Sequence, residues 1–159
     1  MEDREPLQLD ESGTERKKGF YLVIETQGEL YAVRWALVRQ AGMLLQTEID
    51  SSRIPPCVQR DGLSFPVRYL WELVGLKPPV EKLMEIPAVF LEENDRRAVL
   101  VPERVLWKQE AAFRELAQWL KKAPAVDGAI VLDSGVTVIV LEPLVSGSVC
   151  ETGACRLTV

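Results

Sequence analysis

The sequence predicts a mostly β fold made of two small barrels packed against each other, and three observations support this prediction. The apolar runs are short and rich in Val, Ile, Leu and aromatic residues, which is typical of strands. Polar breaks that contain glycine separate these runs. The pattern also occurs twice along the chain, with the order of its segments kept. Two copies of about five strands, each too small to bury its own faces, predict two SH3-like five-stranded barrels.

The first strands form a predicted hairpin. Residues 21–24 and 30–33 are apolar, and they flank a polar break with Gln27 and Gly28 at its tip. Two short β-rich runs joined by such a break indicate an antiparallel pair with a tight turn.

The same hairpin recurs in the second half of the chain. Residues 88–91 and 98–101 repeat the plan, and the copies align without a gap because 88 − 21 = 67. The second strand of each copy runs on to a valine, Val38 or Val105.

A second segment is also duplicated. Residues 62–67 match 135–140 at a spacing of 135 − 62 = 73, and each begins with a turn glycine followed by a β-rich run. One helical turn over 70–74, ended by Gly75, closes the first copy, and residues 144–145 close the second.

One short helix is predicted between strands of the second half. Apolar residues at spacings i, i+3, i+4 and i+7 lie on one helical face, and Pro124 ends the helix. These residues are Phe113, Leu116, Ala117 and Leu120. Trp119 lies off this face, so we expect it to be exposed. We expect core or inter-barrel packing for most of the other tryptophans, which are Trp35, Trp71 and Trp107.

The chain divides into three predicted regions. Residues 1–19 are highly charged and lack periodicity, which indicates a disordered leader. Residues 20–145 form the folded region, with one barrel from each half of it, roughly 20–85 and 86–145. Residues 146–159 are rich in small side chains and are predicted to be a flexible tail.

Charge and composition restrict the function. A net charge of −5 argues against a nucleic-acid partner, whose phosphates need Lys and Arg. No apolar run approaches the ~20 residues that span a bilayer, so we expect a cytoplasmic protein without membrane insertion. The chain has no histidine, the commonest general base and metal ligand, which makes catalysis improbable. We therefore predict no catalytic, metal or cofactor site.

Three residue groups could form an exception to this prediction. Residues 92–97 are polar, but hairpin tips usually are. Asp127 and Asp133 are the only suggestive carboxylate pair, and glycine-flanked aspartates are common in turns. The three cysteines, Cys57, Cys150 and Cys155, are too few for structural zinc. We expect free thiols, with a disulfide or a reversible modification of the last two as the alternative.

Three stretches together resemble the CheW family and the CheW-like regulatory domain of CheA kinases. The hairpin over 21–38 resembles the family's opening strands. The run Asp-Gly-Leu-Ser-Phe-Pro-Val at 61–67 resembles its "RG-x-x-x-PV" strand, and residues 126–144 resemble its glycine-spaced ending. The resemblance implies the double five-stranded barrel and no chemistry. It also implies a chemotaxis adaptor that couples the chemoreceptor cytoplasmic tip to a CheA-type histidine kinase regulatory domain, with other CheW-like proteins as further partners.

The chain also departs from the family pattern. Asp61 precedes the turn glycine where the family has arginine, and Arg60 lies one residue earlier. The connector over 54–62 is shorter than the family's, and Pro102 replaces a common acidic residue. These differences indicate a divergent member. The alternative function is an accessory protein that binds receptor or other scaffold proteins but has lost kinase coupling.

The resemblance also indicates partner-binding residues. They are Val33, Val38, Arg60, Asp61, Gly62 and Pro66. For Val33 an ordinary core position is the preferred explanation, whereas for Val38 a core position and a binding role have equal support. Arg60, Asp61 and Gly62 form a turn in either case.

Overall fold

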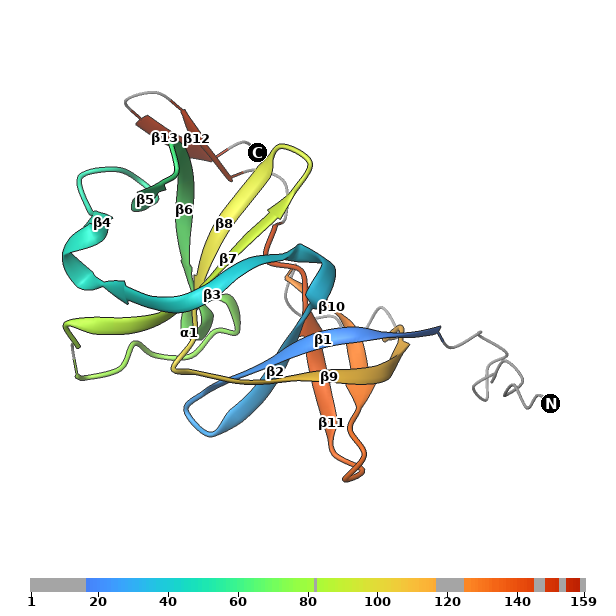
Figure 1. Ribbon diagram of the computed structural model, residues 1–159. Coiled ribbons are helices and arrows are strands. Elements are labelled where there is room, and N and C mark those ends of the chain that lie inside the picture. Colours follow the sequence, from blue (N-terminus) through green and yellow to red (C-terminus); the bar gives the residue numbers. More distant parts are fainter. Residues whose placement is uncertain (1–16, 82, 117–124, 145–147, 152–153, 158–159) are drawn as a thin grey trace.

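The structure is a computed structural model that describes residues 17–81, 83–116, 125–144, 148–151 and 154–157. Strands dominate it, as predicted (Figure 1). They are β1 (Lys17–Thr26), β2 (Glu29–Arg34), β3 (Val38–Leu45), β4 (Ile49–Asp50), β5 (Cys57–Arg60), β6 (Leu63–Tyr69), β7 (Glu85–Glu93), β8 (Arg96–Val101), β9 (Arg104–Arg114), β10 (Val126–Val131), β11 (Thr137–Leu141), β12 (Ser148–Glu151) and β13 (Ala154–Leu157). The helical elements are α1 (Leu70–Leu73) and the 3₁₀ turns η1 (Trp35–Leu37) and η2 (Gln46–Glu48).

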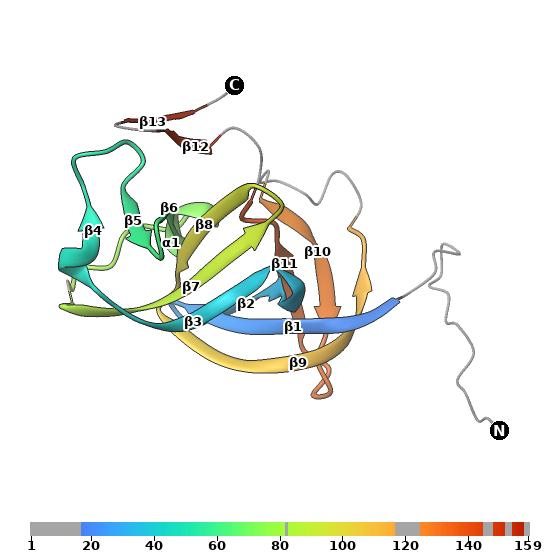
Figure 2. The ribbon, with the colours of Figure 1, turned by 45° about the horizontal axis from the view of Figure 1, so that its top comes forward.

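Two curved sheets pack against each other (Figures 1 and 2). The first is a closed five-stranded barrel in the order β1-β2-β11-β10-β9. The second is a six-stranded sheet in the order β3-β7-β8-β6-β5-β4, which curls toward a barrel without closing. The predicted pair of barrels is therefore present, with one of them open.

Each sheet takes strands from both halves of the chain. The first hairpin, β1-β2, pairs with β9 and β11 of the second half, and the second hairpin, β7-β8, pairs with β3 and β6 of the first half. The prediction that one barrel forms from 20–85 and the other from 86–145 is therefore wrong. A repeated sequence shows which segments are equivalent, but it carries no signal of which copy each segment pairs with.

The duplication is visible in the backbone. Strand β8 begins at Arg96 and β2 at Glu29, which is the predicted spacing of 96 − 29 = 67. Gln27 and Asn94, at the same spacing, both adopt positive φ, 49° and 57°. These matching left-handed turns allow each hairpin to close tightly.

The structure has three apolar cores, one inside each sheet and one between the two sheets. Inside the closed barrel, Tyr21, Ile130 and Val138 are among the buried side chains. Inside the six-stranded sheet, the rings of Phe65 and Phe90 meet edge to face at 5.1 Å. The third core lies between the sheets and is called the inter-barrel core here. Its buried members are Leu22, Ile24, Val33, Leu37, Leu70, Val89, Leu91, Ala98, Leu100, Leu141 and Leu144.

The helix predicted to begin at Phe113 does not begin there. Phe113 lies in β9 and pairs with Lys17 and Ile130, because its ring fills space in the closed barrel. Residue 116 has no regular structure, and the helical positions 117–124, with Trp119, lie outside the described residues. The helical turn before Gly75 is present as α1, and Gly75 has the expected positive φ of 78°.

The ends of the chain also differ from expectation. Residues 17–19, assigned to the leader, belong to β1. Within the predicted flexible tail, β12 and β13 pair as an antiparallel hairpin, with Cys150 opposite Cys155.

Cys57 is buried and disulfide-bonded, so the prediction of a free thiol is wrong at this position. Among the described residues, no helix is both long enough and apolar enough to cross a membrane.

Candidate interaction surface

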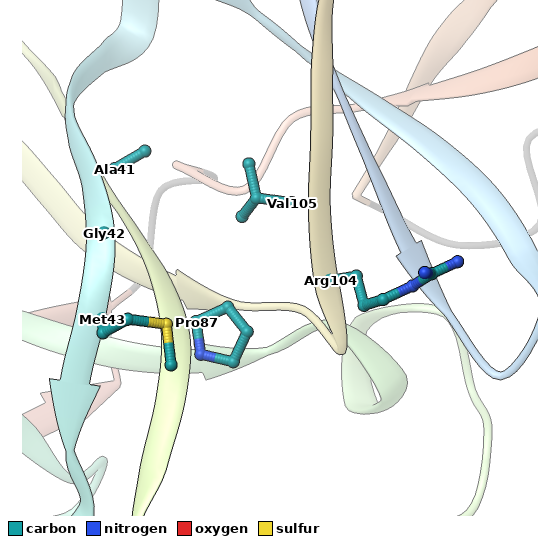
Figure 3. Close-up of a pocket in the computed structure, with 6 residues that line it drawn as sticks. All are labelled: Ala41, Gly42, Met43, Pro87, Arg104 and Val105. Carbon is teal, nitrogen blue, oxygen red and sulfur yellow. The ribbon is translucent and has the colours of Figure 1, made fainter.

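An apolar groove lies where the six-stranded sheet meets the closed barrel (Figure 3). Its volume is about 390 Å³. The residues that line it come from β3 and β7 on one side and from the start of β9 on the other. They are Ala41, Gly42, Met43, Pro87, Arg104 and Val105.

Strand alternation explains the apolar floor of the groove. In β3, Leu44 points into the core of the six-stranded sheet, so Met43 and Leu45 point to the opposite face. Met43 pairs with Pro87 across the strands. The neighbouring Val89 on this face is covered by the closed barrel, whereas Met43 lies beyond that cover and is 59% exposed.

Strand β9 forms the wall of the groove and gives it a charged rim. Val105 packs against the inter-barrel core, and Arg104 leans outward. The Arg104 Nε donates to Oε1 of Glu25 at 2.6 Å. Beside it, Glu103 accepts a hydrogen bond from the backbone N–H of Gln27 at 2.6 Å. The groove therefore combines an apolar floor with charged groups at one end.

Arg34 forms one ion pair within the closed barrel and a longer one across to the six-stranded sheet. Its guanidinium donates to Glu142, just after β11, at 2.7 Å and lies 3.9 Å from Glu93 at the end of β7. Burial lowers the pKa of Arg34, but the hydrogen bond and charge of Glu142, together with the charges of Glu93 and Asp127, raise the pKa overall. Arg68 adds a link of the same kind, because its guanidinium donates to the carbonyl of Pro143. The groove is thus held between two sheets that are tied by charge as well as by apolar packing.

Two of the predicted partner-binding residues belong to the inter-barrel core or pack against it. Val33 is fully buried in this core, which fits the preferred explanation of it as a core valine. Val38 is half-buried against the same core and begins β3, the strand that floors the groove.

The other four lie in the β5-β6 hairpin, which belongs to the six-stranded sheet. The Arg60 guanidinium lies 4.7 Å from the centroid of the Phe90 ring and 3.4 Å from a carboxylate oxygen of Glu48. Asp61 and Gly62 form an exposed left-handed turn with φ of 55° and 76°. Pro66 is buried. The turn is separate from the groove residues, so the predicted positions fall into two groups.

An exposed aromatic patch was missed by sequence reasoning. The Lys108 ammonium lies 4.7 Å from the Phe20 ring centroid and 4.6 Å from that of Trp35. Trp35 and Trp107 are 37% and 44% exposed, so the expectation that they pack in cores is wrong. Trp35 lies in η1 directly after β2, and Trp107 lies within β9 opposite Val23.

The described residues contain no cluster of three potential metal-ligating side chains. The groove combines exposed apolar side chains with paired charges at its rim.

The comparisons with known proteins bear on the fold. No family model matches the sequence, and no curated protein matches it. Among solved structures, the chain is similar to the scaffolding protein TtCheW from Thermoanaerobacter tengcongensis, with a TM-score of 0.64. The alignment covers 79% of this chain and 89% of that chain at 16% identity. This chain has the CheW fold. The resemblance seen in the sequence is confirmed at the level of the fold, and the low identity agrees with a divergent CheW-like chain.

Proposed function

We propose that this CheW-like chain is a non-enzymatic scaffold of a chemosensory system. In this role it couples the cytoplasmic tips of chemoreceptors to the regulatory domain of a CheA-type histidine kinase. The observation that carries the proposal is the apolar groove between the two sheets of a CheW fold. In this proposal the protein is cytoplasmic, the groove binds another protein, and no cofactor takes part.

The groove suits an amphipathic helix. Met43, Pro87 and Val105 offer an apolar strip, and methionine adapts its shape to different side chains. Arg104 and Glu103 at the end of the strip would meet the polar face of such a helix. Helices with one apolar face bind apolar grooves in this way, and a receptor tip is helical in the family that the chain resembles.

The second group of predicted residues supplies a further proposed contact. Asp61 and Gly62 form an exposed turn between β5 and β6, and Arg60 beside it pairs with Glu48. A protein bound there would leave the groove free. A scaffold needs two such separate surfaces to bridge two partners.

One observation favours the alternative, an accessory CheW-like protein that binds receptor or other scaffold proteins without kinase coupling. Strand β4 has only two residues, and the six-stranded sheet remains open between β3 and β4. In this alternative, the shortened connector accounts for the open edge of the sheet. A kinase contact that needs a closed barrel there would be lost.

A charge placed in the groove tests the proposed function. Met43→Glu adds a carboxylate to the apolar floor, and Gln40→Glu adds the same charge to the same strand on its opposite face. Isothermal titration with a receptor-tip fragment should show affinity reduced by about tenfold or more for Met43→Glu and nearly unchanged for Gln40→Glu. Equal affinities for the two variants and the native protein would place the receptor site elsewhere.

A further inference from the structure

Strand β3 has a free hydrogen-bonding edge. It stands at the end of the six-stranded sheet and pairs only with β7 among the described residues. Residues 39–43 are all exposed. An unpaired edge presents a row of N–H and C=O groups that can pair with another strand.

The pairing of β3 with β7 shows which backbone N–H and C=O groups of β3 point away from β7. Met43 is opposite Pro87, which has no N–H to donate, so this pair is a non-hydrogen-bonded one. The backbone groups of Met43, and of Ala41 and Leu45 at the same parity, therefore point away from β7. The Leu45 N–H confirms this direction, because it donates to the Glu48 carboxylate at 2.8 Å. The N–H groups of Ala41 and Met43 are left on the open edge.

This edge lacks the features that normally protect one. Residues 40–47 contain no charged residue and no proline, in a chain that is 27% charged. Met43 and Leu45 expose 59% and 46% of their surface along it. Proteins usually blunt such edges with lysine, proline or bulges, and the only bulge lies earlier, between Val38 and Gln40.

We propose that β3 pairs antiparallel with β3 of a second copy of this chain, about a two-fold axis at Met43. Such a pairing is isologous, so each residue i lies opposite residue 86 − i of the other copy. Met43 faces its own equivalent, and its N–H and C=O both find partners. The Ala41 N–H donates to the Leu45 carbonyl of the second copy, which adds a symmetric pair of bonds.

The side chains at β3 are compatible with this register. In this register residues 41–45 face one another within the strand, with Ala41 opposite Leu45 and Gly42 opposite Leu44, so every facing pair is uncharged. No like charges oppose each other, and this self-complementarity favours a second copy over an unrelated strand. The contact is short, and both copies carry a charge of −5, so the association is weak and concentration-dependent.

Cysteine cross-linking tests the register. In a hydrogen-bonded antiparallel pair the Cα atoms are about 5.5 Å apart, which suits a disulfide. Two copies of Met43→Cys would therefore cross-link, whereas Leu45→Cys, which is also exposed, would place its two sulfurs about 13 Å apart. Under mild oxidation we expect the 43–43 bond, identified by peptide mapping, to form about tenfold faster than the 45–45 bond. Equal rates, or no 43–43 bond, would overturn the proposal.

Sedimentation measures the association without a new thiol. The native protein and Met43→Leu should show the same reversible dimerisation as concentration rises toward about 1 mM. Met43→Pro removes the outward N–H but no bond to β7, and it should shift the protein to monomer. A native protein that stays monomeric, or a folded Met43→Pro that dimerises equally well, would contradict edge pairing. If the proline variant does not fold, the cross-linking rates decide. Neither assay contains a receptor or a kinase, so the result is independent of the proposed function.

Discussion

Val67 of β6 lies beside Val99 of β8 in parallel register, although the two residues come from different copies of the repeat. The equivalent pair in the closed barrel is Val140 and Ala32, at the spacings 140 − 67 = 73 and 99 − 32 = 67. Each copy thus donates a hairpin to one sheet and its later strands to the other. Neither sheet can be completed by one half of the chain.

This exchange predicts that the halves do not fold alone. Fragments 1–80 and 81–159 each lack strands needed by both sheets, so each should give the NMR spectrum of an unfolded chain. When mixed, they should associate and recover a folded spectrum. A fragment that shows dispersed amide resonances by itself would contradict the exchanged topology.

Gly128 is required by close packing in the closed barrel. A Cβ there would lie 2.4 Å from Cζ of Phe113 and 2.7 Å from the carbonyl oxygen of Arg114, and the latter is backbone that cannot turn aside. Gly128→Ala should lower the free energy of unfolding by about 1–3 kcal/mol in urea denaturation. The matched change Gly42→Ala meets open space and should shift it by less than about 0.5 kcal/mol. Similar losses for both would show that the packing at Gly128 is not as described.

The inter-barrel core should contribute most of the stability that joins the sheets. Leu100 is fully buried in it, so Leu100→Ala should cost about 2–5 kcal/mol of unfolding free energy. Leu45→Ala removes the same atoms from a side chain that is 46% exposed and should cost far less. Thermal and urea unfolding of the two variants measure the difference. A small loss for Leu100→Ala would mean that the two sheets are not joined by this core.

Alkaline pH should destabilise the fold. Burial raises the pKa values of Tyr21, Tyr31 and Tyr69 above the ordinary value of 10.0. The folded state therefore holds these protons more tightly than the unfolded state, and the resulting stability is present below about pH 10 and is lost as pH rises through the folded pKa values. Urea unfolding between pH 8 and pH 11 should show this decline, and it should be smaller in Tyr21→Phe. An unchanged profile in that variant would contradict a perturbed Tyr21.

The hairpins were predictable because their signals are local. The break at Gln27 and Gly28 and its copy at Asn94 both appear as left-handed turns. The exchange of strands was not predictable, since equivalent copies have equivalent apolar patterns. Phe113 shows the same limit, because helical spacing placed it on a helix while the closed barrel holds it in β9.

The groove depends on register and packing between distant strands. The predicted binding residue Val38 lies in β3, the strand that floors the groove. Met43 and Pro87, however, become neighbours only through the pairing of β3 with β7. The contact between the Trp35 ring and Lys108 likewise joins residues that are far apart in the sequence. The likeness to CheW, by contrast, rests on turn glycines and apolar runs that the sequence shows directly.

The most direct test of the scaffold proposal is a pair of titrations of the native protein, one with a receptor signalling-tip fragment and one with a CheA-type regulatory domain. We predict binding to both, and a ternary complex because the groove and the turn at Asp61 are separate surfaces. Binding to the receptor fragment alone would support the accessory role. Binding to neither would contradict a chemosensory scaffold.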